Sequence, residues 1–202
     1  MRQHIKYYFS RNLIEYIKAF AIFIIGIVVA IITINNSNEI QKKELKSYVD
    51  EKISVVKNSE YSNQGEVFVD SLKNNFKYFI FLIFLSSTII GIPVAYYLIA
   101  KKGFSIGYTI AAIYATQNVK TGIIFICNSL VIHNIMYMIS MFIVLVAGND
   151  FSKNLIGKEN NIKFEIVRYI IFSVIALAIV ITSSFFEAYI STNFLFLLKK
   201  YL

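Results

Sequence analysis

The sequence predicts an all-α integral membrane protein: a polytopic bundle of about five transmembrane helices with one extracytoplasmic helical arm. Apolar residues make up 57% of the 202-residue chain and charged residues only 16%. A soluble domain of this size cannot cover so much apolar surface with polar groups. The charged residues also leave five long gaps, each close to or above the roughly 20 residues that cross a bilayer as a helix. Helices are expected because lipid cannot satisfy backbone groups, and nothing alternates like a barrel strand.

The first expected span follows a basic N-terminal segment, residues 1–16, and resembles the apolar stretch of a signal peptide. No small-x-small cleavage pattern follows it, so we expect it to be retained as an anchor. The whole chain, 1–202, is then a single membrane domain. The gaps between charges place the spans at residues 17–36, 78–100, 103–119, 121–148 and 169–190.

Lysines and arginines in the short connecting segments predict the orientation. Ten of them fall on the side of the N-terminus and three in the short segments of the opposite side. The positive-inside rule therefore places residues 1–16, the turn at 101–102 and the loop 149–168 in the cytoplasm. The loop 37–77 and the tail 191–202 are expected outside it. We thus expect a multi-pass protein of the cell membrane with its C-terminus outside.

The loop 37–77 is the one sizeable segment expected in water. Its first half repeats apolar residues at helical spacing, and Phe68, Leu72 and Phe76 continue at intervals of four toward the second span. Two interpretations stay open: the two amphipathic helices lie on the bilayer or on each other, or they form an outer docking surface. The segment contains no His or Cys, so catalysis is not expected there.

Small residues mark the third expected span for close packing. Gly103, Gly107, Ala111 and Ala115 lie at intervals of four, and such a stripe lets helix backbones approach each other. Packing within one protomer is favoured because five spans must pack on something. Packing between protomers, as a homo-oligomer, stays open.

A proline lies in the middle of the second expected span. Gly91 and Pro93 are separated by one residue. The proline ring removes a helical hydrogen bond and predicts a kink. The kink is expected to be either static or a hinge.

Three residues are candidates for intramembrane polar or partner-facing roles: His133, Asn134 and Glu187. Ionisable groups at membrane depth are functional candidates. His133 has no companion acid in its own span, so an interhelical hydrogen bond is favoured over a proton relay. Glu187 follows Arg168 by 19 positions, about 28 Å at helical rise. That places it near the outer interface, where anchoring and a partner-facing role are equally open.

No catalytic, cofactor or metal site is expected. The chain has no glycine-rich phosphate loop, no H-E-x-x-H and no G-x-S-x-G motif. Two histidines and one cysteine do not supply a zinc site or a disulfide framework. An intramembrane hydrolase using His133 would lack a second catalytic group. Basic residues are not gathered with aromatic partners, so the expected partner is the lipid bilayer and not a nucleic acid.

Three short motifs occur along the expected spans: Gly91-Ile92-Pro93-Val94, Lys102-Gly103 followed by Gly107-Tyr108-Thr109, and Glu187-Ala188-Tyr189-Ile190-Ser191. In order and spacing they resemble the stage II sporulation protein M family. The length, the basic N-terminal segment and the single outer loop match as well, so the resemblance covers essentially the whole chain. One departure lies in span four, where Ile132-His133-Asn134 replaces a proline followed by polar residues.

The resemblance implies a scaffold of the sporulation engulfment machinery and not an enzyme. Family members are understood to recruit and localise two peptidoglycan-degrading partners, stage II sporulation proteins D and P, at the septal or engulfing membrane. The residues alone leave an alternative: the permease subunit of an exporter that works with a separate ATPase. A neighbouring ATPase gene would favour the exporter, and sporulation-dependent expression would favour the scaffold.

Overall fold

The computed structural model describes residues 8–58, 64–116, 126, 132–157 and 162–191. The elements in these residues are all helical, which confirms the all-α prediction for the described part of the chain. The helices are α2 (Leu13–Asn35), α3 (Glu39–Asn58), α4 (Gln64–Ser86), α5 (Gly91–Thr116), α7 (Ile132–Ile156), α8 (Ile162–Phe185) and the π-helical segment η2 (Phe186–Ser191).

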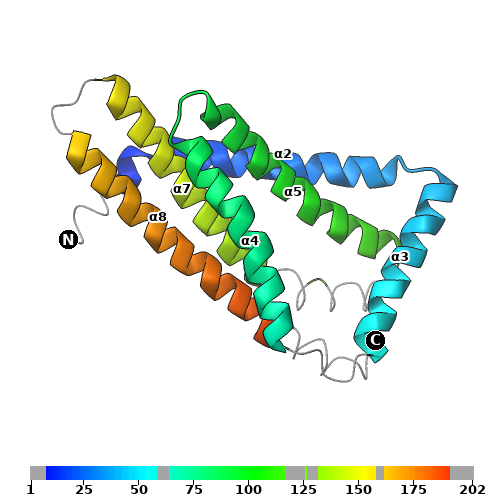
Figure 1. The fold of residues 1–202 in the computed structure, drawn as a ribbon. Helices are drawn as coiled ribbons and strands as arrows, with labels where there is room; N and C mark the ends of the chain where they lie inside the picture. The colour runs from blue at the N-terminus through cyan, green and yellow to red at the C-terminus, as the bar shows by residue number, and fades with distance from the viewer. Residues whose placement is uncertain (1–7, 59–63, 117–125, 127–131, 158–161, 192–202) are drawn as a thin grey trace.

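The helices form two groups that share one end. Figure 1 shows α4, α7 and α8 packed as neighbours, while α2 and α5 run together toward α3. α2 and α5 are parallel, because Glu15 contacts Tyr96 near their starts and Ile27 contacts Gly107 further along. We call the end where Arg11 meets Asp150 the inner end, since the sequence places it in the cytoplasm, and the end with Glu187 the outer end.

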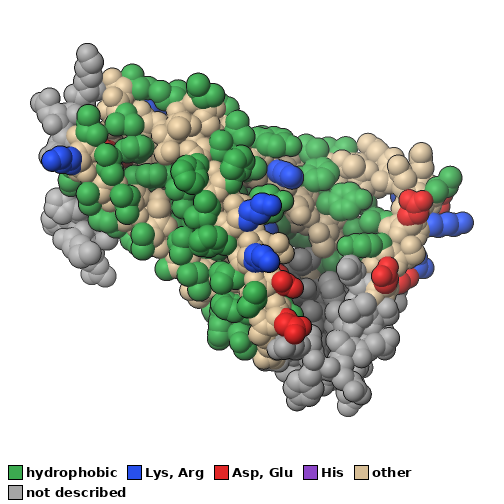
Figure 2. Space-filling model, in the orientation of Figure 1, with side chains coloured by type: hydrophobic (Ala, Val, Ile, Leu, Met, Phe, Trp, Pro, Cys, Tyr) green, Lys and Arg blue, Asp and Glu red, His purple; other side chains and the backbone are tan. Residues whose placement is uncertain are grey.

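The surface is that of a membrane protein. Three helices are long and apolar enough to cross a bilayer: Leu13–Asn35, His133–Ile156 and Ile162–Ile190. Large apolar side chains are exposed along α2 and α8, and hydrophobic atoms cover most of the face in Figure 2. Soluble proteins rarely expose an apolar surface of this extent. The count of five spans stays a prediction, because α4 and α5 carry lysines along their lengths.

The structure corrects the boundary between the second and third expected spans. Residues 78–100 are not one kinked helix: α4 ends at Ser86 and α5 begins at Gly91. The backbone N–H of Gly91 donates to both the carbonyl and the side-chain oxygen of Thr88, each at 3.1 Å. A Cβ atom at Gly91 would lie 2.2 Å from the backbone oxygen of Leu85. This tight turn therefore requires glycine, and Pro93 falls in the first turn of α5, where its missing N–H has no helical acceptor.

The observed helices also differ from other expected boundaries. The turn at 101–102 is wrong, because both lysines lie inside α5. Residues 149–168 are largely helical, since α7 continues to Ile156 and α8 starts at Ile162. The arm 37–77 comprises α3 and the first half of α4, which continues without a break to Ser86. Most of the segment 117–131 and the tail 192–202 lie outside the described residues.

Glycines bring helix backbones into contact at two crossings. Gly103 and Gly107 of α5 pack on Phe23 and Ile27 of α2, so these two residues of the stripe pack within the protomer. Ala111 is half-buried and Ala115 is exposed. At the second crossing, a Cβ atom on Gly148 of α7 would lie 2.5 Å from the backbone oxygen of Ser86 in α4.

An apolar core fills the space between the two ends. It excludes water from the middle of the bundle and separates two layers of polar side chains. Its fully buried members are Ala19 of α2, Phe79 and Leu82 of α4, Ala95 and Ile99 of α5, Val144 and Leu145 of α7, and Ala176 and Val180 of α8.

Candidate functional site

Polar side chains from three helices meet at the outer end. We call Ser71, Asn75, His133, Ser184 and Glu187 the outer polar cluster. Ser71 and Asn75 share one face of α4 because they are four residues apart, and Ser184 and Glu187 are three apart where α8 passes into η2. The cluster therefore joins α4, α7 and the end of α8.

Glu187 has a hydroxyl donor on another helix. The Ser71 side chain donates to Oε2 of Glu187 at 2.5 Å, across 116 positions of sequence. His133 Nε2 lies 4.0 Å from Oε1 of the same carboxylate, too long for a hydrogen bond. The structure thus supplies the acid that His133 lacks in its own helix.

His133 is 8% exposed, and its interhelical bond is made by its backbone. Its carbonyl accepts a hydrogen bond from Ser183 at 2.7 Å, whereas its ring Nε2 lies 3.0 Å from Nδ2 of Asn134. In this arrangement the Asn134 amide nitrogen donates and the His133 Nε2 accepts. Nδ1 is buried and has no hydrogen-bond partner among the described residues. The interhelical hydrogen bond expected of the His133 side chain stays a prediction, because the bond to α8 is accepted by the backbone carbonyl.

Asn75 extends the cluster across the bundle. Its Nδ2 donates to Ser71 at 3.2 Å and to Ser184 at 3.3 Å, and its carbonyl accepts from the Tyr137 hydroxyl at 3.3 Å. The Tyr137 hydroxyl of α7 bonds to the backbone carbonyl of Asn75, and the Asn75 side chain bonds to Ser184 of α8. These bonds fix the spacing of α4, α7 and α8 at the outer end. Buried polar groups of this kind specify one arrangement when they are satisfied.

The π-helical segment η2 carries Glu187. π-Helical turns inside α-helices occur frequently at functional sites. Tyr189 of η2 stacks on Phe185 at 4.5 Å and lies 6.4 Å from the Phe68 ring of α4. The spacing of apolar residues does not predict this change of helical period.

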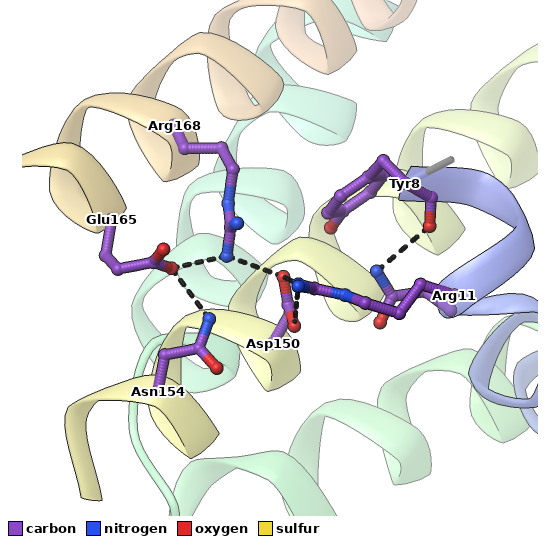
Figure 3. A network of polar contacts seen from close by, with 7 residues as sticks. Tyr8, Arg11, Asp150, Asn154, Glu165 and Arg168 are labelled. Carbon is purple, nitrogen blue, oxygen red and sulfur yellow. Dashed lines mark hydrogen bonds and ion pairs between the residues drawn. The ribbon is translucent and has the colours of Figure 1, made fainter. Parts of the chain in front are cut away.

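A network of charged residues closes the inner end (Figure 3). Arg11 donates to both carboxylate oxygens of Asp150 at 2.7 Å, and Arg168 donates to one of them at 2.6 Å. Arg168 also pairs with Glu165, which accepts from Asn154 at 2.8 Å. The segment before α2, the end of α7 and the start of α8 are thereby joined.

Aromatic contacts cover this inner network. The ring of Tyr8 stacks on Phe172 with centroids 4.6 Å apart, and the Arg168 guanidinium lies 5.6 Å from the Tyr8 ring. Burial raises the pKa of the Tyr8 phenol above its ordinary value, and the nearby charge of Asp150 adds to the rise. From the sequence alone, Arg11 and Arg168 predict only the orientation of the chain in the membrane.

The two polar layers differ in chemistry. The inner layer holds ion pairs, whereas the outer cluster holds one carboxylate, one imidazole and several hydroxyl and amide groups. Within the described ranges, no three His, Cys, Asp or Glu side chains are placed to hold a metal ion. Cys127 lies outside those ranges. The outer arrangement is suited to holding helices together and to presenting a fixed outer surface.

Comparison with known proteins gives one match. Residues 19–192 match the family model described as stage II sporulation protein M. No curated protein and no solved structure matches the chain. The matched region includes the whole outer polar cluster and leaves out Arg11 and Glu15 of the inner end.

Proposed function

The chain belongs to the stage II sporulation protein M family and is a sporulation-related membrane protein; on that premise, we propose that it is a scaffold of the engulfment machinery. It recruits peptidoglycan-degrading partners and localises them at the septal membrane, without catalysing the reaction itself. The partners proposed are the stage II sporulation proteins D and P. The observation that carries the proposal is the family match over residues 19–192.

The outer end supports this role. α3 packs on α5 through Val49, which contacts Ala112 and Ile113. Ile40 and Tyr48 of the same helix are 73% and 58% exposed. An apolar residue on a polar, exposed helix is the kind of contact that a protein partner covers. We place the docking surface on α3.

The test is co-purification from sporulating cells. The tagged protein is solubilised in detergent, and the recovered proteins are identified by mass spectrometry. The proposal expects recovery of wall hydrolases. Recovery of an ATPase without hydrolases would contradict it and favour an exporter.

α3 can be altered without changing the outer polar cluster, whereas the first half of α4 cannot. Deleting 39–76 would remove Ser71 and Asn75 and so disturb the bundle. Replacing residues 39–58 with a Gly/Ser linker of equal length changes α3 alone. This variant should insert and remain folded but recover few hydrolases. Full recovery would mean that docking occurs elsewhere.

A matched pair of point variants controls for loss of apolar surface. Ile40→Gln changes an exposed residue of α3, and Ile90→Gln changes one that is 88% exposed in the inner turn. Hydrolase recovery should fall severalfold for Ile40→Gln and stay unchanged for Ile90→Gln. Equal recovery in both variants would remove Ile40 from the proposed surface.

A further inference from the structure

The α4–α5 hairpin has an uncharged stretch too short to cross a bilayer. From the turn, α4 runs back from Ser86 to Tyr78 before it meets Lys77, and α5 runs forward from Gly91 to Ala100 before it meets Lys101. Each stretch is about 15 Å long at helical rise. The hydrocarbon core is about 30 Å thick. The hairpin therefore presents apolar surface to about half of the bilayer, counted from the inner end.

Lysines lie where the apolar surface of the hairpin stops. Lys73 and Lys77 of α4 and Lys101 of α5 are exposed, and Lys102 is half-buried. Figure 2 shows a row of Lys and Arg side chains on the face formed by α4 and α5, with acidic side chains only further along. A bilayer next to a short apolar surface thins, which brings its headgroups closer to the lysines.

A cavity of about 270 Å³ opens among α4, α5 and α7 at this depth. None of the described residues that line it is a carboxylate; Leu98 and Met141 form its apolar wall. Its polar lining consists of ammonium, amide and hydroxyl groups, which can donate hydrogen bonds. Asn75 already donates both amide hydrogens to Ser71 and Ser184. The other donors include Asn74, Tyr78, Lys101, Lys102 and Ser105.

The positive charge of this cavity is not neutralised within it. Lys102 Nζ lies 4.7 Å from the centroid of the Tyr137 ring, a cation–π contact that leaves its positive charge in place. Within the described part of the chain, neither Lys101 nor Lys102 forms an ion pair with a carboxylate. Charged groups at membrane depth normally pair with an opposite charge. The Glu187 carboxylate interacts electrostatically with Lys102 from outside the cavity lining, but none of the described residues that line the cavity supplies an anion.

We propose that this cavity binds the phosphate of an anionic membrane lipid from the leaflet on the side of α3. A phosphate group accepts hydrogen bonds through several oxygens and thus matches the many donors better than the two oxygens of a carboxylate. Lysines near the bilayer surface attract anionic lipids. The short apolar surface of the hairpin brings the headgroup to the cavity, and the acyl chains lie in the bilayer beside it. The inference goes beyond the scaffold role and does not depend on it.

The test measures lipid binding to the full chain in a non-ionic detergent by native mass spectrometry. The probes are dioctanoyl-phosphatidylglycerol, dioctanoylglycerol, which lacks the phosphate, and inorganic phosphate, which lacks the chains. Lys101→Gln combined with Lys102→Gln removes the two cavity charges. Lys42→Gln combined with Lys43→Gln removes two charges from α3 and is the matched control. Thermal unfolding verifies that each variant is folded.

The wild-type protein should bind dioctanoyl-phosphatidylglycerol, and the cavity double variant should bind it about tenfold more weakly. The α3 double variant should bind like the wild type. Equal affinity in the cavity variant would overturn the proposal, as would equally tight binding of dioctanoylglycerol. Binding of inorganic phosphate as tight as that of the lipid would show that the ligand is a free anion and would overturn the assignment to lipid.

A second variant tests lipid binding in the cavity if the double lysine variant does not fold. Asn74→Asp places a negative charge in the cavity at an exposed position. It should weaken binding of the phosphatidylglycerol probe and leave the unfolding temperature unchanged. Unchanged binding in this variant would also overturn the proposal.

Discussion

A Cβ atom added to Gly103 would lie 2.3 Å from the backbone oxygen of Phe23. The reverse holds one turn away, where a Cβ atom on Gly26 would lie 2.2 Å from the backbone oxygen of Ala100. α2 and α5 therefore touch backbone to backbone. Contacts of this kind drive helix association in membranes, where apolar side chains gain little by leaving lipid.

Gly103→Ala should destabilise the protein. The added methyl group would meet backbone atoms, which cannot rotate away, so the helices must separate at a cost of about 1–3 kcal/mol. Thermal unfolding in detergent, followed by circular dichroism, measures the loss. Gly157→Ala is the control, because its Cβ atom would lie 3.5 Å from the nearest backbone oxygen. Equal midpoints for the two variants would contradict the close contact.

Asp150→Asn should loosen the inner end. The carboxylate is buried and accepts hydrogen bonds from both Arg11 and Arg168. Hydrogen bonds to a charged group contribute about 1.5–3 kcal/mol, so the midpoint of unfolding should fall clearly. Glu44→Gln removes an exposed charge on α3 and should leave the midpoint within experimental error. A stable Asp150→Asn variant would mean that the network adds nothing to stability.

Ser71 and Glu187 should be energetically coupled. The hydroxyl of Ser71 donates to the carboxylate at 2.5 Å. A double-mutant cycle with Ser71→Ala and Glu187→Gln measures the coupling, which should be about 0.5–3 kcal/mol for groups in direct contact. A parallel cycle that pairs Glu187→Gln with Ser47→Ala of α3 should give additive effects. Additive effects in the first cycle would mean that the hydrogen bond between Ser71 and Glu187 does not stabilise the outer end.

Pro93→Ala should change stability by less than about 1 kcal/mol. Proline in the first turn of a helix loses no hydrogen bond and only restricts the unfolded chain. Ala95→Pro, two residues further into α5, should cost about 3 kcal/mol or more, since it removes a helical bond. Unfolding midpoints compare the two. A large fall in the unfolding midpoint of Pro93→Ala would contradict the position of Pro93 in the first turn of α5 and favour the kinked helix predicted from the sequence.

Charge gaps predict which parts of this chain are apolar but not where the chain turns. The uncharged stretch 78–100 has the length of a span, yet it contains a turn at 87–90 held by Thr88 and Gly91. Lys101 and Lys102 were expected in a loop because charges are costly in lipid. They lie inside α5 because that helix starts after the turn and because Lys102 contacts the Tyr137 ring. Tertiary contacts therefore decided the boundary.

The candidate site was predictable only in part. His133, Asn134 and Glu187 stood out because polar groups are rare in apolar stretches. Their partners did not: Ser71 is one of many serines, and it lies 116 positions from Glu187. Arg11 and Asp150 are 139 positions apart, and no local pattern joins them. Such pairs form because helices pack against each other, and composition and residue spacing do not predict which helices become neighbours.

The parallel contact between α2 and α5 bears on the order of assembly. α2 precedes its main neighbours, α5 and α7, in the chain. Its glycine face therefore remains in contact with lipid until Gly103 and Gly107 leave the ribosome. α3 and α4 are synthesised in that interval. The first anchor must be stable in the bilayer as a single helix, and its burial is completed only by a later insertion from the same side of the membrane.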